Sequence, residues 1–318
     1  MCPTVSFERF PRGIAVLSTP EGEELGKKLG KTFSNSYYVG TYTREQLSKA
    51  AECYDAVVLV MSLPGAFRVA CEVLKGKGEG PAVVVVDPLG KFVIPLANAH
   101  WGANELAEEL AWKIGATAVI TTVAERRGLK PLEALARELY AELEPKELIV
   151  SYYKAMLNGE TICTDFDPPE GYSYLKRGDD CGLRITTECR QGTLCLKPYS
   201  LFVGIGAKPK VEDLARRAVR VLEELRVPKG RVKAVGSVRE EARGVAEALG
   251  AEFRLFSFDE LRDFKDDCLS PPSDTLKSIG LTGVAEIIAL KLAGERGKLL
   301  VRKVKGEDFT LAVAGVAQ

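Results

Sequence analysis

Residues 81–96 read PAVVVVDPLGKFVIPL. The apolar run at 83–86 has the length of a strand, and residues 91–96 read as a second strand. Pro88 and Gly90 stand between the two, where a type I turn favours them. The stretch therefore predicts a β-hairpin.

Strand and helix patterns alternate on both sides of this hairpin. The segments GIAVLST (13–19) and DAVVLVM (55–61) before it read as strands, and TREQLSKAAECY (43–54) as a helix. An alanine-rich helix and the strand TAVITT (117–122) follow it. This alternation predicts a mostly parallel sheet covered by helices.

The rest of the chain divides into two further regions. Residues 144–199 are rich in Gly, Cys, Thr, Tyr and Asp, and 157–166 and 182–187 read as short strands. The alternation returns from residue 200. We therefore expect two three-layer α/β domains with largely parallel or mixed sheets, joined by a small mainly β middle region. The predicted boundaries are 1–143, 144–199 and 200–318.

The charge balance and the apolar runs exclude some classes of protein. Forty-four basic and forty-four acidic side chains cancel, whereas general nucleic-acid binding needs a basic field or stripe. No apolar run approaches the roughly 20 residues of a membrane helix. The first residues lack the layout of a signal peptide, so we expect no nucleic-acid partner, no membrane and a cytoplasmic location.

Four of the eight cysteines, Cys163, Cys181, Cys189 and Cys195, fall within one segment of 33 residues. They contain no C-x-x-C spacing, which disfavours a zinc site. Disulfides and free buried thiols both remain open for them.

A first candidate site is NAHWGANE (98–105), which holds the only histidine of the chain, His100. Gly102 and Ala103 leave the backbone open in front of a helix that Asn104 and Glu105 begin. Backbone N–H groups at such a helix start attract anions. His100 and Glu105 are candidates for a general base, and a purely structural histidine is the alternative.

A second candidate, MSLPGAFR (61–68), follows a strand directly and contains Gly65 and Arg68. In α/β sheets, ligands bind beyond the carboxyl ends of the strands. We therefore consider Gly65 and Arg68 as substrate-binding residues, with a turn glycine and a solvated arginine as the alternative.

Two further candidates lie in the C-terminal region. VGIGAKPK (203–210) combines Gly204 and Gly206 with two lysines, Lys208 and Lys210, which indicates anion binding without the full pattern of a nucleotide loop. The long segment 270–283 carries the hydroxyl groups of Ser273 and Thr282, for which capping and turn roles are the alternative. No G-x-S-x-G motif of a hydrolase elbow occurs.

Several segments, in order, resemble the cobalamin biosynthesis protein G (CbiG) family, the cobalt-precorrin-5A hydrolases. The resemblance covers most of the chain. It rests on residues 81–96, 99–122, 157–161, 196–206, 255–261, 270–290 and 299–314.

The resemblance implies a reaction on a cobalt-bearing macrocycle in cobalamin (adenosylcobalamin) biosynthesis. Enzymes of this family open a δ-lactone and release acetaldehyde. The cobalt would come with the tetrapyrrole substrate, so we expect no cofactor or metal from the protein. Other cobalamin pathway enzymes are candidate partners, and a homodimer remains open.

Residues 99–103 depart from the family pattern, which has more glycines around the histidine. This difference motivates an alternative hypothesis. The chain would then be a non-catalytic corrinoid-binding homologue that holds or hands over pathway intermediates.

Overall fold

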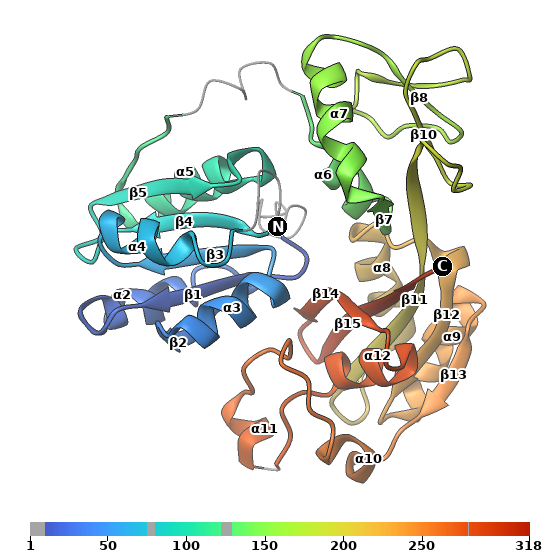
Figure 1. Cartoon of the computed structure of the whole chain (residues 1–318). Coiled ribbons are helices and arrows are strands. Elements are labelled where there is room, and N and C mark those ends of the chain that lie inside the picture. The colour runs from blue at the N-terminus through green and yellow to red at the C-terminus, as the bar shows by residue number, and fades with distance from the viewer. Residues whose placement is uncertain (1–9, 75–79, 122–128, 279) are drawn as a thin grey trace. The chain divides into compact units, whose positions relative to one another are not determined.

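The computed structural model of the chain describes residues 10–74, 80–121, 129–278 and 280–318 (Figure 1). The chain forms two compact units. The first takes residues from 1–122 and 201–315, and the second from 123–200 and 316–318. The predicted boundaries after residues 143 and 199 concern domains that fold separately. They stay a prediction.

The first unit contains a six-stranded sheet built by the N-terminal part of the chain. Its first four strands are parallel, β4 and β5 pair antiparallel, and β5 and β6 are parallel. The predicted hairpin is thus confirmed. The spatial order is β2 (Ser36–Thr41), β1 (Ile14–Ser18), β3 (Ala56–Val60), β4 (Ala82–Val86), β5 (Phe92–Ala97) and β6 (Thr117–Ala118).

Helices cover both faces of this sheet because alternate residues of its buried strands point to opposite sides. On one face, Val58 belongs to a core with α2 (Glu23–Leu29) and α5 (Ala103–Ile114). On the other face, Val57 belongs to a core with α3 (Arg44–Cys53) and α4 (Leu63–Ala70). A short 3-10 helix, Pro20–Gly22, precedes α2.

The first unit also holds a mixed sheet formed by the C-terminal part of the chain. In it, β11 (Leu194–Ala207, from Leu201 onward), β12 (Val232–Ser237) and β13 (Glu252–Leu255) are parallel neighbours. The hairpin of β14 (Lys298–Lys305) and β15 (Phe309–Ala317) joins through β15. The α/β fold class expected from the sequence is confirmed. The helices are α8 (Leu214–Glu224), α9 (Arg243–Leu249), α10 (Phe258–Arg262), α11 (Asp274–Ser278) and α12 (Ala285–Ala293).

The second unit combines two helices with short strands. Four parallel strands lie in the spatial order β9 (Leu175–Arg177), β8 (Ile162–Thr164), β10 (Arg184–Thr186) and the first half of β11. On its other side, β11 pairs antiparallel with β7 (Ala141–Glu144). Disulfides join Cys163 to Cys181 and Cys189 to Cys195. The four cysteines of this segment are therefore disulfide-bonded in the structure and are not free thiols. The helices are α6 (Leu132–Glu138) and α7 (Lys146–Leu157).

Some predicted elements differ from the observed ones. The pattern of PLEALARELYAEL (131–143) predicts one helix, but α6 ends at Glu138. The residues from Ala141 form β7 instead, where every second side chain along Ala141–Glu144 is buried. Of the strand expected over 117–122, the described residues form only the two-residue β6 at the sheet edge beside β5, and residue 122 lies outside the described part. Helix α7 was not expected, although Tyr152, Ala155 and Met156 are buried at helical spacing.

Buried tyrosines give the chain a measurable response to alkali. Burial raises the pKa of Tyr37 to about 12, and burial also raises the pKa values of Tyr54, Tyr153, Tyr172 and Tyr174. A group whose pKa is higher in the folded state stabilises the fold below its unfolded pKa, which is about 10 for tyrosine. That stabilisation is lost as the pH rises further.

We therefore expect phenolate absorbance to rise in two steps during alkaline titration, with the later step accompanying unfolding. The urea-unfolded chain should titrate in one step near pH ~10. A single reversible step near that pH in the folded protein would contradict the expectation.

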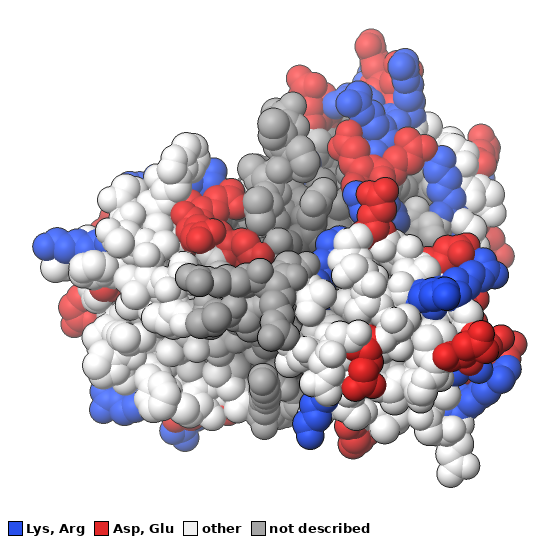
Figure 2. Space-filling view, turned by 90° about the horizontal axis from the view of Figure 1, so that it is seen from above, with Lys and Arg blue, Asp and Glu red and all other residues white. Residues whose placement is uncertain are grey.

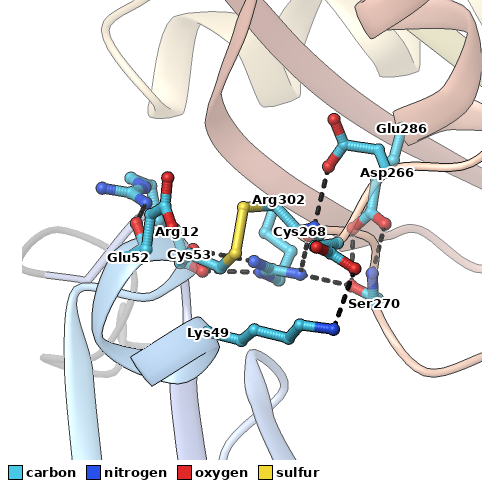
Figure 3. The surroundings of a disulfide bond; sticks show 10 residues. Arg12, Lys49, Glu52, Cys53, Asp266, Cys268, Ser270, Glu286 and Arg302 are labelled. Carbon is cyan, nitrogen blue, oxygen red and sulfur yellow. Dashed lines mark hydrogen bonds and ion pairs between the residues drawn. A yellow bond between two sulfur atoms is a disulfide. The ribbon is translucent and has the colours of Figure 1, made fainter. Parts of the chain in front are cut away.

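In the first unit, a buried arginine and a disulfide join segments that are far apart in the sequence (Figure 3). Arg302 is 1% exposed. Its guanidinium donates to the carbonyl oxygens of Arg12 at 2.6 Å, Cys53 at 2.9 Å and Cys268 at 2.6 Å. The Cys53–Cys268 disulfide spans a sequence separation of 215. Arg302 thus hydrogen-bonds to the carbonyl oxygens of the same two cysteines that the disulfide joins.

The buried charges around Arg302 are satisfied by nearby polar groups. The ring centroid of Tyr54 lies 3.9 Å from the guanidinium carbon, within the range of a cation–π interaction. The Ser270 hydroxyl accepts from Arg302 at 3.4 Å and donates to Glu286 at 2.6 Å. Glu286 also accepts from the backbone N–H of Lys303 at 2.9 Å. The cluster is therefore a connected network rather than an isolated buried ion.

Candidate functional site

The start of α5 is built by a turn with an unusual backbone. Asn98 adopts a left-handed conformation, and its side-chain amide donates to the Pro81 carbonyl at 2.9 Å. Gly102 has a φ of 102°, a conformation that favours glycine. The first backbone N–H groups of a helix have no acceptor inside that helix. Helix starts of this kind can bind anions, and at this one the Gly102 N–H donates to the Ala99 carbonyl at 3.0 Å.

The side chains of this turn differ in burial. Asn104 is 2% exposed, and Glu105 is half-buried in the first turn of the helix. Trp101 packs against the core that α5 shares with the sheet. His100 belongs to the 3-10 helix Ala99–Trp101, but its side chain lies outside what the structure describes. Among the side chains described here, Glu105 is thus the candidate base.

Gly65 and Arg68 lie away from the α5 start. Helix α4 begins after β3, at the edge where β4 also ends. Because β5 runs antiparallel to β4, with Val83 beside Ala97, α5 begins at the opposite edge. The two helices also cover opposite faces of the sheet. The structure therefore does not bring Gly65 and the exposed Arg68 together with Gly102 and Asn104.

Gly204 has a packing reason for being glycine. A Cβ atom there would lie 1.9 Å from the Ala285 carbonyl oxygen and 2.6 Å from the Ala289 nitrogen of α12. Gly206 lies nearer the end of β11, where a Cβ atom would lie 3.2 Å from that of Val284, the residue before α12. Gly206 is therefore placed beside a helix start, whereas Gly204 is inside the strand–helix contact.

The predicted lysines and hydroxyl groups are at the surface. Lys208 forms an ion pair with Asp308 at 2.8 Å, and its hydrogen bond to that carboxylate raises its pKa. Lys210 is exposed in the turn that follows. The exposed Ser273 hydroxyl accepts from the Leu276 N–H at 3.4 Å near the start of α11, while the exposed Thr282 precedes α12. The structure thus groups Gly206, Lys208 and Thr282 around the end of β11 and the start of α12.

The charges on the face in Figure 2 are of both signs. Lysine and arginine side chains are scattered among aspartate and glutamate side chains on that face. Among the described residues, no helix is long and apolar enough to cross a bilayer. Arg239 was not among the candidates from the sequence, and it follows β12 at the same sheet edge as Gly206. Its position two residues after the apolar stretch 232–237 was the available signal.

Two regions match models of known families. Residues 45–125 match the cobalamin synthesis G N-terminal model, and residues 201–314 match the cobalamin synthesis G C-terminus model. A solved structure described as a cobalamin biosynthesis protein G homolog, from Sulfolobus solfataricus, is 32% identical and has a TM-score of 0.78. The similarity covers 97% of this chain and 99% of that one. The chain belongs to the CbiG family.

Curated CbiG relatives carry an enzyme name. A cobalt-precorrin-5A hydrolase from Priestia megaterium is 26% identical over 94% of this chain and 93% of the relative. A second cobalt-precorrin-5A hydrolase, from Salmonella typhimurium, is also 26% identical, over 96% of this chain and 98% of the relative. The two family-model matches include both the α5 start and the end of β11.

Proposed function

We propose that this CbiG chain is a cobalt-precorrin-5A hydrolase. It would open the δ-lactone of the cobalt macrocycle and release acetaldehyde. The observation that carries the proposal is the similarity, over almost the full chain, to two hydrolases of that name. The metal in this reaction is substrate cobalt, so the proposal gives the protein no metal of its own.

The α5 start supports this chemistry. The macrocycle carries acetate and propionate carboxylates, which suit backbone N–H groups at a helix start. Lactone hydrolysis needs a base for the attacking water and donors for the developing oxyanion. In the proposed site, the backbone at the start of α5 binds the anionic groups, although the Gly102 N–H itself is held by the Ala99 carbonyl at 3.0 Å. Glu105 or His100 is the base.

The proposal is tested with anaerobically prepared cobalt-precorrin-5A and an enzyme-coupled assay for acetaldehyde. Wild-type protein should release acetaldehyde in a fixed ratio to substrate consumed. Tight binding of the macrocycle without acetaldehyde would refute the hydrolase and favour the corrinoid-binding homologue.

The base assignment is tested by Glu105→Gln, which keeps the size of the side chain but removes its basicity. We expect kcat to fall by about 100-fold, within the usual range for loss of a general base. The matched control is Glu108→Gln, because Glu108 is on the same helix and exposed. His100→Ala is assayed alongside. Undiminished release in both Glu105→Gln and His100→Ala would remove both residues from the base role.

A further inference from the structure

Arg239 lies at the carboxyl edge of the C-terminal sheet. It follows β12 by two residues, beside the end of the parallel strand β11. In α/β sheets this is the edge beyond which ligands bind. Arg239 is therefore a basic group at the position where the topology favours a ligand.

The backbone and one side-chain nitrogen of Arg239 are held in place. The Ser237 hydroxyl, which is fully buried, accepts from the Arg239 N–H at 3.1 Å. The Nε of Arg239 donates to the Ala207 carbonyl at 3.4 Å, and the residue is half-buried. The Nε hydrogen bond holds the guanidinium group in place. The two terminal nitrogens of the group can then bind a ligand.

Two other cations near this edge have carboxylate partners. Lys208 pairs with Asp308, and Arg243 pairs with Glu240. Within the described part of the chain, no carboxylate forms an ion pair with Arg239. A planar guanidinium binds a carboxylate with two parallel hydrogen bonds, which an ammonium group cannot do. Arg239 thus matches a carboxylate supplied from outside.

We propose that Arg239 binds a peripheral carboxylate of the tetrapyrrole substrate. The identity of the ligand rests on the proposed function, whereas the carboxylate chemistry rests on Arg239 and its surroundings. The start of α12 flanks the same end of β11 through Val284, beside Gly206. Arg239 is a substrate-binding residue in this proposal, and the bond-breaking step does not involve it.

The test compares two cobalt corrinoids that differ in their side chains. Cobyrinic acid carries free carboxylates, and cobinamide carries amides in their place. We expect Arg239→Gln to weaken cobyrinic acid binding about tenfold or more, as loss of a charge-assisted pair does, and to leave cobinamide binding unchanged. The affinity of Arg239→Lys for cobyrinic acid should fall between those of wild type and Arg239→Gln. Lysine keeps the positive charge but cannot form the two parallel hydrogen bonds of a guanidinium.

Arg243→Gln is the matched control because Arg243 is on the same segment and pairs with Glu240. It should bind both corrinoids as wild type does, and thermal unfolding shows whether each variant is folded. Equal binding of cobyrinic acid by wild type and Arg239→Gln would overturn the proposal. The same holds for an equal loss with both corrinoids, or for wild type failing to prefer cobyrinic acid.

The acetaldehyde assay separates this proposal from the proposed function. Arg239-dependent binding of cobyrinic acid without acetaldehyde release retains the carboxylate subsite and refutes the hydrolase. Acetaldehyde release together with unchanged binding by Arg239→Gln retains the hydrolase and refutes the subsite.

Discussion

Arg302→Met should lower the free energy of unfolding of the first unit by about 3–5 kcal/mol, the range for removing one member of a buried charged network. Methionine fills much of the same space, so the effect arises from lost hydrogen bonds. The carbonyl oxygens of Arg12, Cys53 and Cys268 would lose their buried donor. Each buried polar group left unsatisfied costs about 1–3 kcal/mol.

Urea denaturation followed by tryptophan fluorescence measures this effect, since both tryptophans, Trp101 and Trp112, lie in the first unit. Arg220→Met is the control, because Arg220 pairs with Glu224 at the surface, where such a pair contributes about 0–1 kcal/mol. Similar losses in the two variants would show that the buried network does not stabilise the fold.

Removing the Cys53–Cys268 disulfide should have the second large effect. A cross-link across a separation of 215 restricts the unfolded chain strongly, by about 5 kcal/mol in the chain-entropy model, while measured losses are typically about 2–4 kcal/mol. We expect the double variant Cys53→Ala/Cys268→Ala to unfold at lower urea concentration by an amount within that range. The same fluorescence measurement applies, without reductant.

Two controls separate loop closure from the loss of cysteine itself. Cys71→Ala removes an exposed free thiol and should leave stability unchanged. Cys189→Ala/Cys195→Ala opens a loop with a separation of only 6, for which the same model gives about 2 kcal/mol. A larger loss from the short loop than from the long one would contradict the loop-closure argument.

Local patterns were enough to predict the central hairpin and the alternation around it. The valine run and the Asp87–Gly90 turn act over a few residues, and their outcome does not depend on the rest of the chain. The reversal at this hairpin also decides that α4 and α5 begin at opposite edges. The predicted turn therefore already implied that Arg68 and the α5 start are two separate candidate sites.

Other features depend on contacts that local patterns do not contain. Cys53 and Cys268 carry no spacing signal because the partner is supplied by a distant segment. A glycine pair such as Gly204 and Gly206 indicates open backbone, but sequence alone cannot distinguish a bound anion from a packed helix. Arg302 lies in β14, whose sequence gives no sign of a buried charge. The carbonyl groups that accept its hydrogen bonds come from distant segments, and they alone explain the burial.

The Cys53–Cys268 bond also has a topological consequence. Together with the backbone from 53 to 268 it closes a covalent ring, and residues 123–200, the main part of the second unit, are members of that ring. A single backbone cut between residues 54 and 267 would leave both fragments in one molecule until the sulfur bridge is reduced. The ring also cannot close during synthesis until Cys268 has been added, long after the residues of the N-terminal sheet.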